Sequence, residues 1–371
     1  MRAAAFIVCY SLFGLSSGCS EGSSSGGVGG TSGASGEAGA GGVYSGGGTG
    51  GGSEVPVEVL TGPLPGVASP RLLDDGYIYY RAKEPKGGYN SGTEWLLKRV
   101  PKAGGPIELI LKADTALYIM TTDASAYYVQ IPQTSDDNGV AWTEDIKRLP
   151  FGTSAPEPFI DAVNSNDDFF YLAQGPAGLF FAVGHEYYKT TLAGYAKPGP
   201  NRLFWSAKLD GFLEQSWVQD DHLYFAGKDA TQKYSIGRVP LAGGIHETVV
   251  DYPDLCRPLG PTDGSQGFVA VCTGTAGQDV AVIDLSGAVT TLAANVIPQD
   301  AYKLTGPRAG ILYWQGDDAL YAFNLSTKGL SALTLKSGYS MFAIDEAHVY
   351  AFAANSAVVR SPLSALQPVS P

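Results

Sequence analysis

The chain has 371 residues, 44% of them hydrophobic and 16% charged, and 36 acidic residues against 24 Lys and Arg give a formal net charge of -12. This composition excludes a wholly disordered chain, and its acidic balance argues against a nucleic-acid partner, which would require a surface that neutralises phosphates. The 21 Tyr, 49 Gly and 23 Pro favour strands separated by turns over long helices, so the predicted fold class is all-β.

Residues 1–18 have the pattern of a secretory signal peptide. Arg2 supplies a positive charge, and the apolar run Ala3–Leu15 that follows is too short to span a bilayer. We therefore expect the chain to be exported and this segment to be removed.

The signal ends in Leu15-Ser16-Ser17-Gly18-Cys19, which resembles the lipobox of bacterial lipoproteins. The resemblance implies cleavage before Cys19, lipidation (palmitate among the acyl chains) of that cysteine, and stable anchoring in a membrane. Ser20 after the cysteine favours the outer membrane by analogy with enterobacterial sorting, with the domain facing the periplasm or the cell surface. The alternative is a signal peptide in which the cysteine is incidental.

Residues 19–53 begin with the lipidated cysteine and continue as an almost unbroken run of Gly, Ser, Ala and Thr. Such a segment holds too few apolar groups to compensate the entropy of ordering. The sequence predicts a disordered tether here and a folded domain over residues 54–371.

Four cysteines occur in the chain, and two of them remain for the folded domain. Cys9 leaves with the signal and Cys19 takes lipid, so Cys256 and Cys272 can pair in an oxidising compartment. Two buried free thiols are the alternative. No further ligands of matching spacing accompany them, and His222 and His348 lie in separate repeats, so no metal and no cofactor are predicted.

An internal repeat organises the folded domain. Its first half is an acidic or turn-forming residue followed by an aromatic strand, which recurs at Asp74-Asp75, Asp123, Asp167-Asp168, Asp220-Asp221, Ala309 and Asp345-Glu346. Its second half is a strand that ends in a turn. Arg99-Val100-Pro101-Lys102-Ala103-Gly104-Gly105 returns as Arg238-Val239-Pro240-Leu241-Ala242-Gly243-Gly244 with one change. We interpret the acidic residues as turn formers, because Asp hydrogen-bonds its own backbone in tight turns.

Seven copies of the second half can be placed, ending at positions 101, 150, 210, 240, 284, 324 and 362. Their mean spacing, about 43 residues, matches a four-stranded propeller blade. The sequence predicts a seven-bladed β-propeller, with six blades as the alternative. Because closing the ring removes exposed sheet edges, we expect Val55–Leu60 to pair within the blade formed by residues 339–366.

The repeats resemble the Tyr-rich blades of bacterial lipoprotein propellers and, distantly, the YWTD repeats of low-density-lipoprotein-receptor propellers, which Tyr313-Trp314-Gln315-Gly316-Asp317 approximates. The resemblance covers about residues 55–366 and implies a propeller. Fold alone does not assign a function.

Long connections between the second and third strands of the first three units are the best functional clue. They span Pro85–Glu94, Thr134–Glu144 and Gly175–Asn201, which we expect on one face of the ring. The ligand-binding candidates on or beside them are aromatic or amphipathic: Tyr89, Trp95, Trp142, Phe180, Phe181, His185, Tyr187, Tyr188 and Tyr195. The alternative for the third connection is that it folds back and buries Leu179–Val183.

The functional hypothesis is a lipid-anchored envelope protein whose propeller binds a protein or glycan through this face. A hydrolase or lyase with its site at the central channel mouth is the alternative, and no catalytic motif in the sequence identifies such a site.

Overall fold

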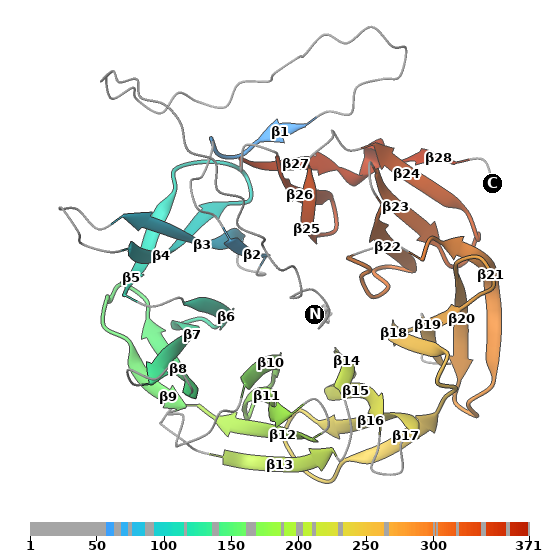
Figure 1. The fold of residues 1–371 in the computed structure, drawn as a ribbon, viewed down its shortest axis with the longest axis horizontal. Coiled ribbons are helices and arrows are strands. Elements are labelled where there is room, and N and C mark those ends of the chain that lie inside the picture. The colour runs from blue at the N-terminus through green and yellow to red at the C-terminus, as the bar shows by residue number, and fades with distance from the viewer. Residues whose placement is uncertain are drawn as a thin grey trace, which may run out of the picture.

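Runs of aromatic and β-branched residues form the strands, and Gly, Pro and Asp lie at the turns between them, as in β15 (His222–Lys228) and β19 (Gly267–Thr273). In the computed structural model these strands assemble into seven four-stranded antiparallel sheets arranged in a ring (Figure 1). The fold is therefore a seven-bladed β-propeller, as predicted, and six blades are excluded.

The structure describes residues 57–62, 68–72, 76–85, 93–114, 117–135, 141–160, 168–186, 189–197, 203–209, 213–228, 233–262, 267–299, 301, 303–316, 319–334, 339–353 and 357–369. Cys19 and the predicted tether lie outside the described residues. Within the described ranges, no helix is both long and apolar enough to cross a membrane.

Blades one to three follow one another along the chain, each written from its inner to its outer strand. Blade one holds β2 (Ala68–Leu72), β3 (Tyr77–Pro85), β4 (Thr93–Pro101) and β5 (Glu108–Ala113). Blade two holds β6 (Tyr118–Thr122), β7 (Ala126–Ser135), β8 (Ala141–Pro150) and β9 (Glu157–Ile160). Blade three holds β10 (Asp168–Gln174), β11 (Gly178–Glu186), β12 (Lys189–Ala196) and β13 (Leu203–Leu209).

Blades four and five repeat the same order. Blade four holds β14 (Leu213–Gln219), β15, β16 (Tyr234–Pro240) and β17 (Glu247–Asp251). Blade five holds β18 (Cys256–Pro261), β19, β20 (Gln278–Asp284) and β21 (Val289–Ile297).

Strands from the two ends of the described chain complete blades six and seven. Blade six holds β22 (Ile311–Gln315), β23 (Ala319–Asn324), β24 (Leu330–Thr334) and β28 (Gln367–Pro368). Here an irregular segment that includes Thr305 lies inside β22, so β22 and β23 correspond to the second and third strands of the other blades. Blade seven holds β25 (Ser340–Ile344), β26 (His348–Phe352), β27 (Val358–Pro362) and β1 (Glu58–Val59), and the short helix η1 (Leu363–Ala365) joins β27 to β28.

The hydrophobic core lies between neighbouring blades. Because successive side chains of a strand point to opposite faces of the sheet, Tyr79 packs with Leu117 and Tyr127 of blade two, whereas Tyr80 packs with Tyr350 and other residues of blade seven. This alternation explains why the second strand of a blade tolerates consecutive aromatic residues: each ring is buried against a different neighbour.

Four blades share a cross-strand triad of Tyr, Arg and Glu on their second, third and outer strands. In blade one Tyr79 lies opposite Arg99, which lies opposite Glu108. The equivalent triads are Tyr128-Arg148-Glu157, Tyr224-Arg238-Glu247 and Tyr350-Arg360-Glu58. The sequence repeat shows the Arg and the Tyr, and the structure adds the Glu that ties each outer strand to its blade.

The last triad shows how the ring closes. Glu58 of β1 accepts from Arg360 Nε at 2.8 Å, the backbone N–H of Leu60 donates to the Val358 carbonyl at 2.8 Å, and the Leu60 side chain is buried. The N-terminal strand thus supplies the outer strand of blade seven, which confirms the predicted pairing. The C-terminal strand β28 adds a second tie, pairing with β24 of blade six, which the sequence did not predict.

Blade three corrects one prediction. Phe169, Phe170 and Tyr171 lie in its inner strand β10, and not in the second strand as the repeat scan assumed. The third strand therefore ends at Ala196, and the marker at position 210 follows the outer strand β13. In this blade the aromatic run that follows the acidic residues lies in the inner strand, whereas in the other blades it lies in the second strand, so the repeat was assigned to the wrong strand.

The turn residues behave as their chemistry requires. Asp123 accepts from the backbone N–H groups of Ser125 and Ala126 and from the Tyr128 hydroxyl, and Asp345 accepts from the N–H groups of Ala347 and His348. This confirms the interpretation as turn formers for Asp123 and Asp345. Asp74, Asp75 and Asp167 lie outside the described residues.

The predicted disulfide is present. Cys256 and Cys272 lie opposite each other on β18 and β19 and are bonded, which links the inner strand of blade five to its neighbour.

Candidate functional site

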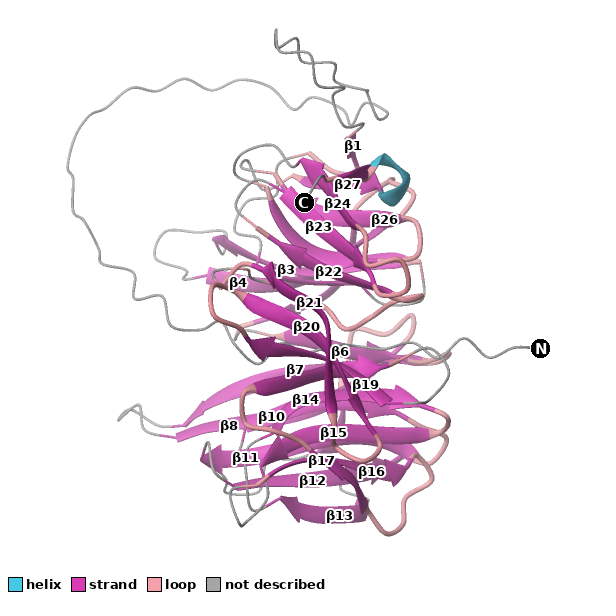
Figure 2. Cartoon of the chain, turned by 90° about the vertical axis from the view of Figure 1, so that its right-hand side faces the viewer, coloured by secondary structure: helices cyan, strands magenta, loops and turns pink. Residues whose placement is uncertain are grey.

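The two faces of the propeller differ. We call the face where second strands turn into third strands the hairpin face, and the opposite face, which carries Asp123 and Asp345, the turn face. The second and third strands of blades one to three are 8 to 10 residues long, whereas those of blades four to seven are 5 to 7. In Figure 2 the long hairpins reach the same side of the disc, on the left. The hairpin face is asymmetric, as expected.

The third connection is not a long loop. Residues 178–186 and 189–196 form the paired strands β11 and β12. Phe180 and Phe181 are both 0% exposed, packed in the interfaces with blades four and two respectively, and Tyr195 packs half-buried against the second of these. The packing alternative is therefore the one observed, and the two phenylalanines stabilise the core rather than form a surface.

The other candidates fall into two groups. Tyr89, Tyr187 and Tyr188 lie outside the described residues. Trp142 and His185 lie in β8 and β11, where the structure describes the backbone but not their side chains.

Trp95 is the one candidate whose described side chain contributes to the hairpin side of the blade-one and blade-two boundary. The Arg81 guanidinium lies 5.1 Å from the Trp95 ring and 4.1 Å from that of Tyr118, the first residue of the inner strand β6. Arg81 Nε is buried without a hydrogen-bond partner. A cation between two aromatic rings is held in place by cation–π attraction, and its positive charge is not neutralised by a carboxylate among the described residues.

Two more cations lie beside the channel on the inner edge of blades five and six. Arg257 follows Cys256 at the start of β18, and Lys303 lies in the irregular segment inside β22, where the N–H of Thr305 donates to the Tyr313 carbonyl. Burial lowers the pKa of both Arg257 and Lys303, and the negative charge of Glu214 acts in the opposite direction on Arg257. Lys303 donates to Ser340 Oγ at 2.6 Å and to the Met341 carbonyl, both neutral acceptors. In the part of the chain that the structure describes, neither cation forms an ion pair.

One carboxyl group shares this region. Glu214, at the start of the inner strand β14, accepts a hydrogen bond from the Tyr252 hydroxyl at 3.3 Å. Burial raises the pKa of Glu214, and the positive charges of Arg257 and Lys228 act in the opposite direction. A carboxyl group in this setting can exchange a proton nearer to neutral pH than an exposed one.

These polar and charged side chains belong to different blades: Arg81 to blade one, Tyr118 to blade two, Glu214 to blade four, Arg257 to blade five, and Lys303 to the segment before β22 of blade six. None of them belongs to a sequence motif, and only Glu214 and Arg257 are close enough to shift each other's pKa. One signal was available: Arg257 is a charged residue within the otherwise uncharged strand Cys256–Pro261.

The three histidines with described side chains do not form one site. His222 and His348 begin the second strands of blades four and seven, at equivalent positions, and His246 is exposed before β17. Among the described residues, no group of three or more His, Cys, Asp or Glu side chains has the arrangement of a metal site.

No protein-family model and no curated protein matches this sequence. Solved structures share its fold. The β-propeller domain of the Trilobed protease from Pyrococcus furiosus matches with a TM-score of 0.56 at 10% identity, over 84% of this chain and 97% of that one. A puromycin-hydrolyzing peptidase of Mycobacterium tuberculosis matches with a TM-score of 0.54 at 13% identity, over 81% of this chain and 53% of that one.

Oligogalacturonate lyase from Vibrio parahaemolyticus matches with a TM-score of 0.51 at 10% identity, over 84% of this chain and 94% of that one. Identities this low show the fold alone. The Pyrococcus propeller is described as having an open velcro topology, whereas here β1 pairs with β27 and closes the ring.

Proposed function

We propose that this chain is a lipid-anchored envelope protein whose propeller binds an anionic protein or glycan ligand at the channel mouth on the hairpin face. The observation that supports this most directly is the pair of half-buried cations, Arg257 and Lys303, without ion-pair partners among the described residues of a chain with a net charge of -12. Partly buried charges are costly unless they are compensated. A carboxylate-bearing ligand supplies that compensation.

The proposed anchor fits this role. Cys19 carries the lipid, residues 20–53 serve as the tether, and the chain enters the propeller at β1, the outer strand of blade seven. Because the tether joins the propeller at an outer strand, it does not start from the central channel or from the hairpin face. The expected location is the outer membrane, and replacing Cys19 with Ala should move the protein from the membrane fraction to the soluble fraction of the envelope.

Binding can be tested with the chain expressed from residue 20. Polygalacturonate and polyglutamate are carboxylate polymers of the glycan and peptide classes, and dextran is the uncharged control. We expect Arg257→Gln to weaken binding of the preferred polymer about tenfold, the effect of one charge-assisted hydrogen bond. Lys328→Gln is the matched control, because it removes the same charge from an exposed turn between β23 and β24.

If the Arg257 and Lys328 variants lose the same amount of binding affinity, the effect comes from the overall charge of the protein, which would contradict the proposed site. Absence of binding to either carboxylate polymer would contradict the anionic ligand. Tyr187 and Tyr188, which lie between β11 and β12 in the sequence, remain candidates for ligand contacts, and replacing both with Ala should weaken binding without unfolding the domain.

A second function is favoured by one observation, the raised pKa of Glu214 beside Tyr252 and Arg257. A carboxyl group of this kind can serve as a general acid or base next to a cation that binds a substrate carboxylate, which fits a lyase or hydrolase. Shortening of a carboxylate polymer by the wild-type chain, abolished by Glu214→Gln with binding retained, would establish the enzyme. If the wild-type chain binds the polymer without shortening it, the protein is a binding protein and the enzyme hypothesis fails.

A further inference from the structure

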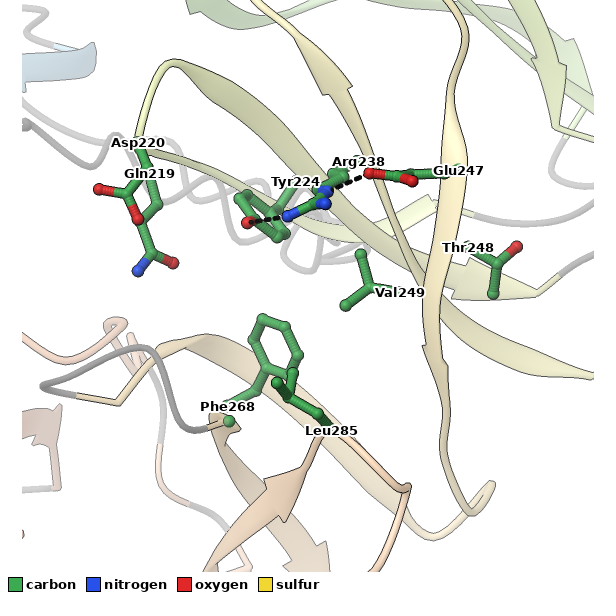
Figure 3. A pocket seen from close by; sticks show the side chains of 10 residues that line it. Gln219, Asp220, Tyr224, Arg238, Glu247, Thr248, Val249, Phe268 and Leu285 are labelled. Atoms are coloured by element: carbon green, nitrogen blue, oxygen red, sulfur yellow. Dashed lines mark hydrogen bonds and ion pairs between the residues drawn. The ribbon is translucent and has the colours of Figure 1, made fainter.

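A cavity of about 360 Å³ lies on the turn face between blades four and five, away from the channel mouth on the hairpin face. One wall is the sheet of blade four, with Tyr224, Arg238 and Glu247, and the other is blade five, with Phe268 and Leu285 (Figure 3). Arg238 donates from Nε to Glu247 at 2.5 Å and from Nη1 to the Tyr224 hydroxyl at 3.3 Å. Its second terminal nitrogen has no partner among the described residues.

Two of the three equivalent arginines, Arg99 and Arg360, reach the next blade, whereas Arg148 donates to Ser125 and Glu157 of its own blade. Arg99 of blade one donates to the hydroxyl of Tyr127 in blade two at 2.7 Å, and Arg360 of blade seven donates to the Lys102 carbonyl in blade one at 2.6 Å. The side chains of Arg99 and Arg360 are 22% and 18% exposed, whereas that of Arg238 is 37% exposed. Arg238 therefore lacks the contact from the neighbouring blade.

Sequence register identifies the missing group. Tyr127 pairs with the residue before Pro150 at the end of β8, and Phe268 pairs with the residue before Asp284 at the end of β20. The ring positions agree as well, since Tyr127 lies 5.8 Å from Tyr79 and Phe268 lies 6.0 Å from Tyr224. Phe268 thus places a ring where Tyr127 does, without the hydroxyl.

A second difference opens the space. In blade two the Phe151 ring lies 4.7 Å from the ring of Tyr127 and covers it. The residue at the same position of blade five, following the end of β20, is Leu285, which is smaller and 56% exposed. The site between blades four and five therefore lacks both the hydroxyl and the covering aromatic ring that are present between blades one and two.

The missing hydroxyl and the missing aromatic ring indicate which chemical groups a ligand would supply. An aromatic ring stacked over Phe268 would replace Phe151, and a hydroxyl on that ring would replace the Tyr127 hydroxyl at Arg238. An anion is disfavoured, because Glu247 already neutralises Arg238 and Asp220 lines the same cavity. We propose that this cavity binds an uncharged phenol ring, such as the tyrosine side chain of a partner polypeptide. This site is independent of the proposed carboxylate site on the hairpin face.

The test uses the chain from residue 20 and follows chemical shifts on titration with N-acetyl-tyrosinamide, with N-acetyl-phenylalaninamide as the matched control. We expect the tyrosine derivative to bind at least about tenfold more tightly, because only it offers a hydroxyl to Arg238. 4-Methylphenol separates the two sources of such a ring: equal affinity points to a free phenolic compound, and weaker affinity points to a tyrosine within a polypeptide.

Two variants fill the cavity from within. Phe268→Tyr supplies the missing hydroxyl and should raise the melting temperature while weakening binding at least about tenfold. Leu285→Phe supplies the covering ring and should also weaken binding, while Tyr127→Phe, the reverse change between blades one and two, should lower the melting temperature. Equal binding of the two amides, no binding at all, or unchanged binding by both Phe268→Tyr and Leu285→Phe would overturn the proposal.

Discussion

Removing the Leu60 side chain should weaken the closure of the ring, because this residue packs the segment after β1 between blades seven and one. Leu60 is 6% exposed and packs with Ile78, Tyr80 and Val358 between blades seven and one. Leu-to-Ala changes in cores cost about 2 to 5 kcal/mol. Since Leu60 lies at the rim, where the site can partly collapse, we expect Leu60→Ala to lower the free energy of unfolding by about 3 kcal/mol.

Two neighbouring residues give expected losses of unfolding free energy with which Leu60→Ala can be compared. The Glu58 side chain is 54% exposed in its ion pair with Arg360, so Glu58→Ala should cost no more than about 1 kcal/mol. The Thr61 hydroxyl accepts from the buried N–H of Val358 at 3.1 Å, and leaving that group unpaired should cost about 1 to 3 kcal/mol. Deleting residues 54–62 removes all three contributions, roughly 5 kcal/mol together.

The assay is urea unfolding followed by tryptophan fluorescence, with a deletion of residues 20–53 as the control. That control should leave the free energy of unfolding unchanged. The reasoning is refuted if the two deletions have equal effects, or if Leu60→Ala is no more destabilising than Glu58→Ala.

Two further perturbations follow from the structure. Replacing both Cys256 and Cys272 with Ala should lower the free energy of unfolding by about 3 kcal/mol, the entropic contribution of a cross-link closing a loop of about 15 residues; an equal urea midpoint for this variant and the wild type under oxidising conditions would contradict it. Burial opposes the ionisation of Asp123, but hydrogen bonds from Ser125 and Lys197 hold its pKa well below the usual range. The folded pKa is thus lower than the unfolded value of about 3.9, so this stabilisation is present above about pH 4 and is lost as the pH falls further. Asp123→Asn should flatten the decline of the urea midpoint below pH 4, and parallel pH profiles would exclude this role.

Local chemistry made much of the fold predictable. The match between Arg99–Gly105 and Arg238–Gly244 marks the same strand end in two blades, because the same Arg, Pro and Gly-rich turn recur at one structural position. The disulfide was predicted because an exported domain lies in an oxidising compartment. The pairing of β1 was predicted because closing the ring removes exposed sheet edges. Blade three was wrongly predicted because Asp168 and the aromatic residues after it resemble the start of a second strand but lie in the inner strand β10.

The candidate site was less accessible to sequence reasoning. Phe180 and Phe181 look like surface aromatics when assigned to a loop, yet alternate faces of β11 bury them against different blades. Arg257 and Lys303 lie in different blades, and nothing local indicates that both lie beside the channel. Sequence patterns indicate the register within a blade, whereas the position of each of these side chains on the inner edge of the ring depends on how the blades are ordered.

A crystal structure of the chain from residue 20 with a galacturonate oligomer, or a glutamate oligomer if that binds more tightly, tests the central claim most directly. We expect the ligand at the channel mouth on the hairpin face, with a carboxylate within hydrogen-bond distance of Arg257 or Lys303. A ligand bound elsewhere, or an unoccupied channel mouth at saturating concentration, would contradict it.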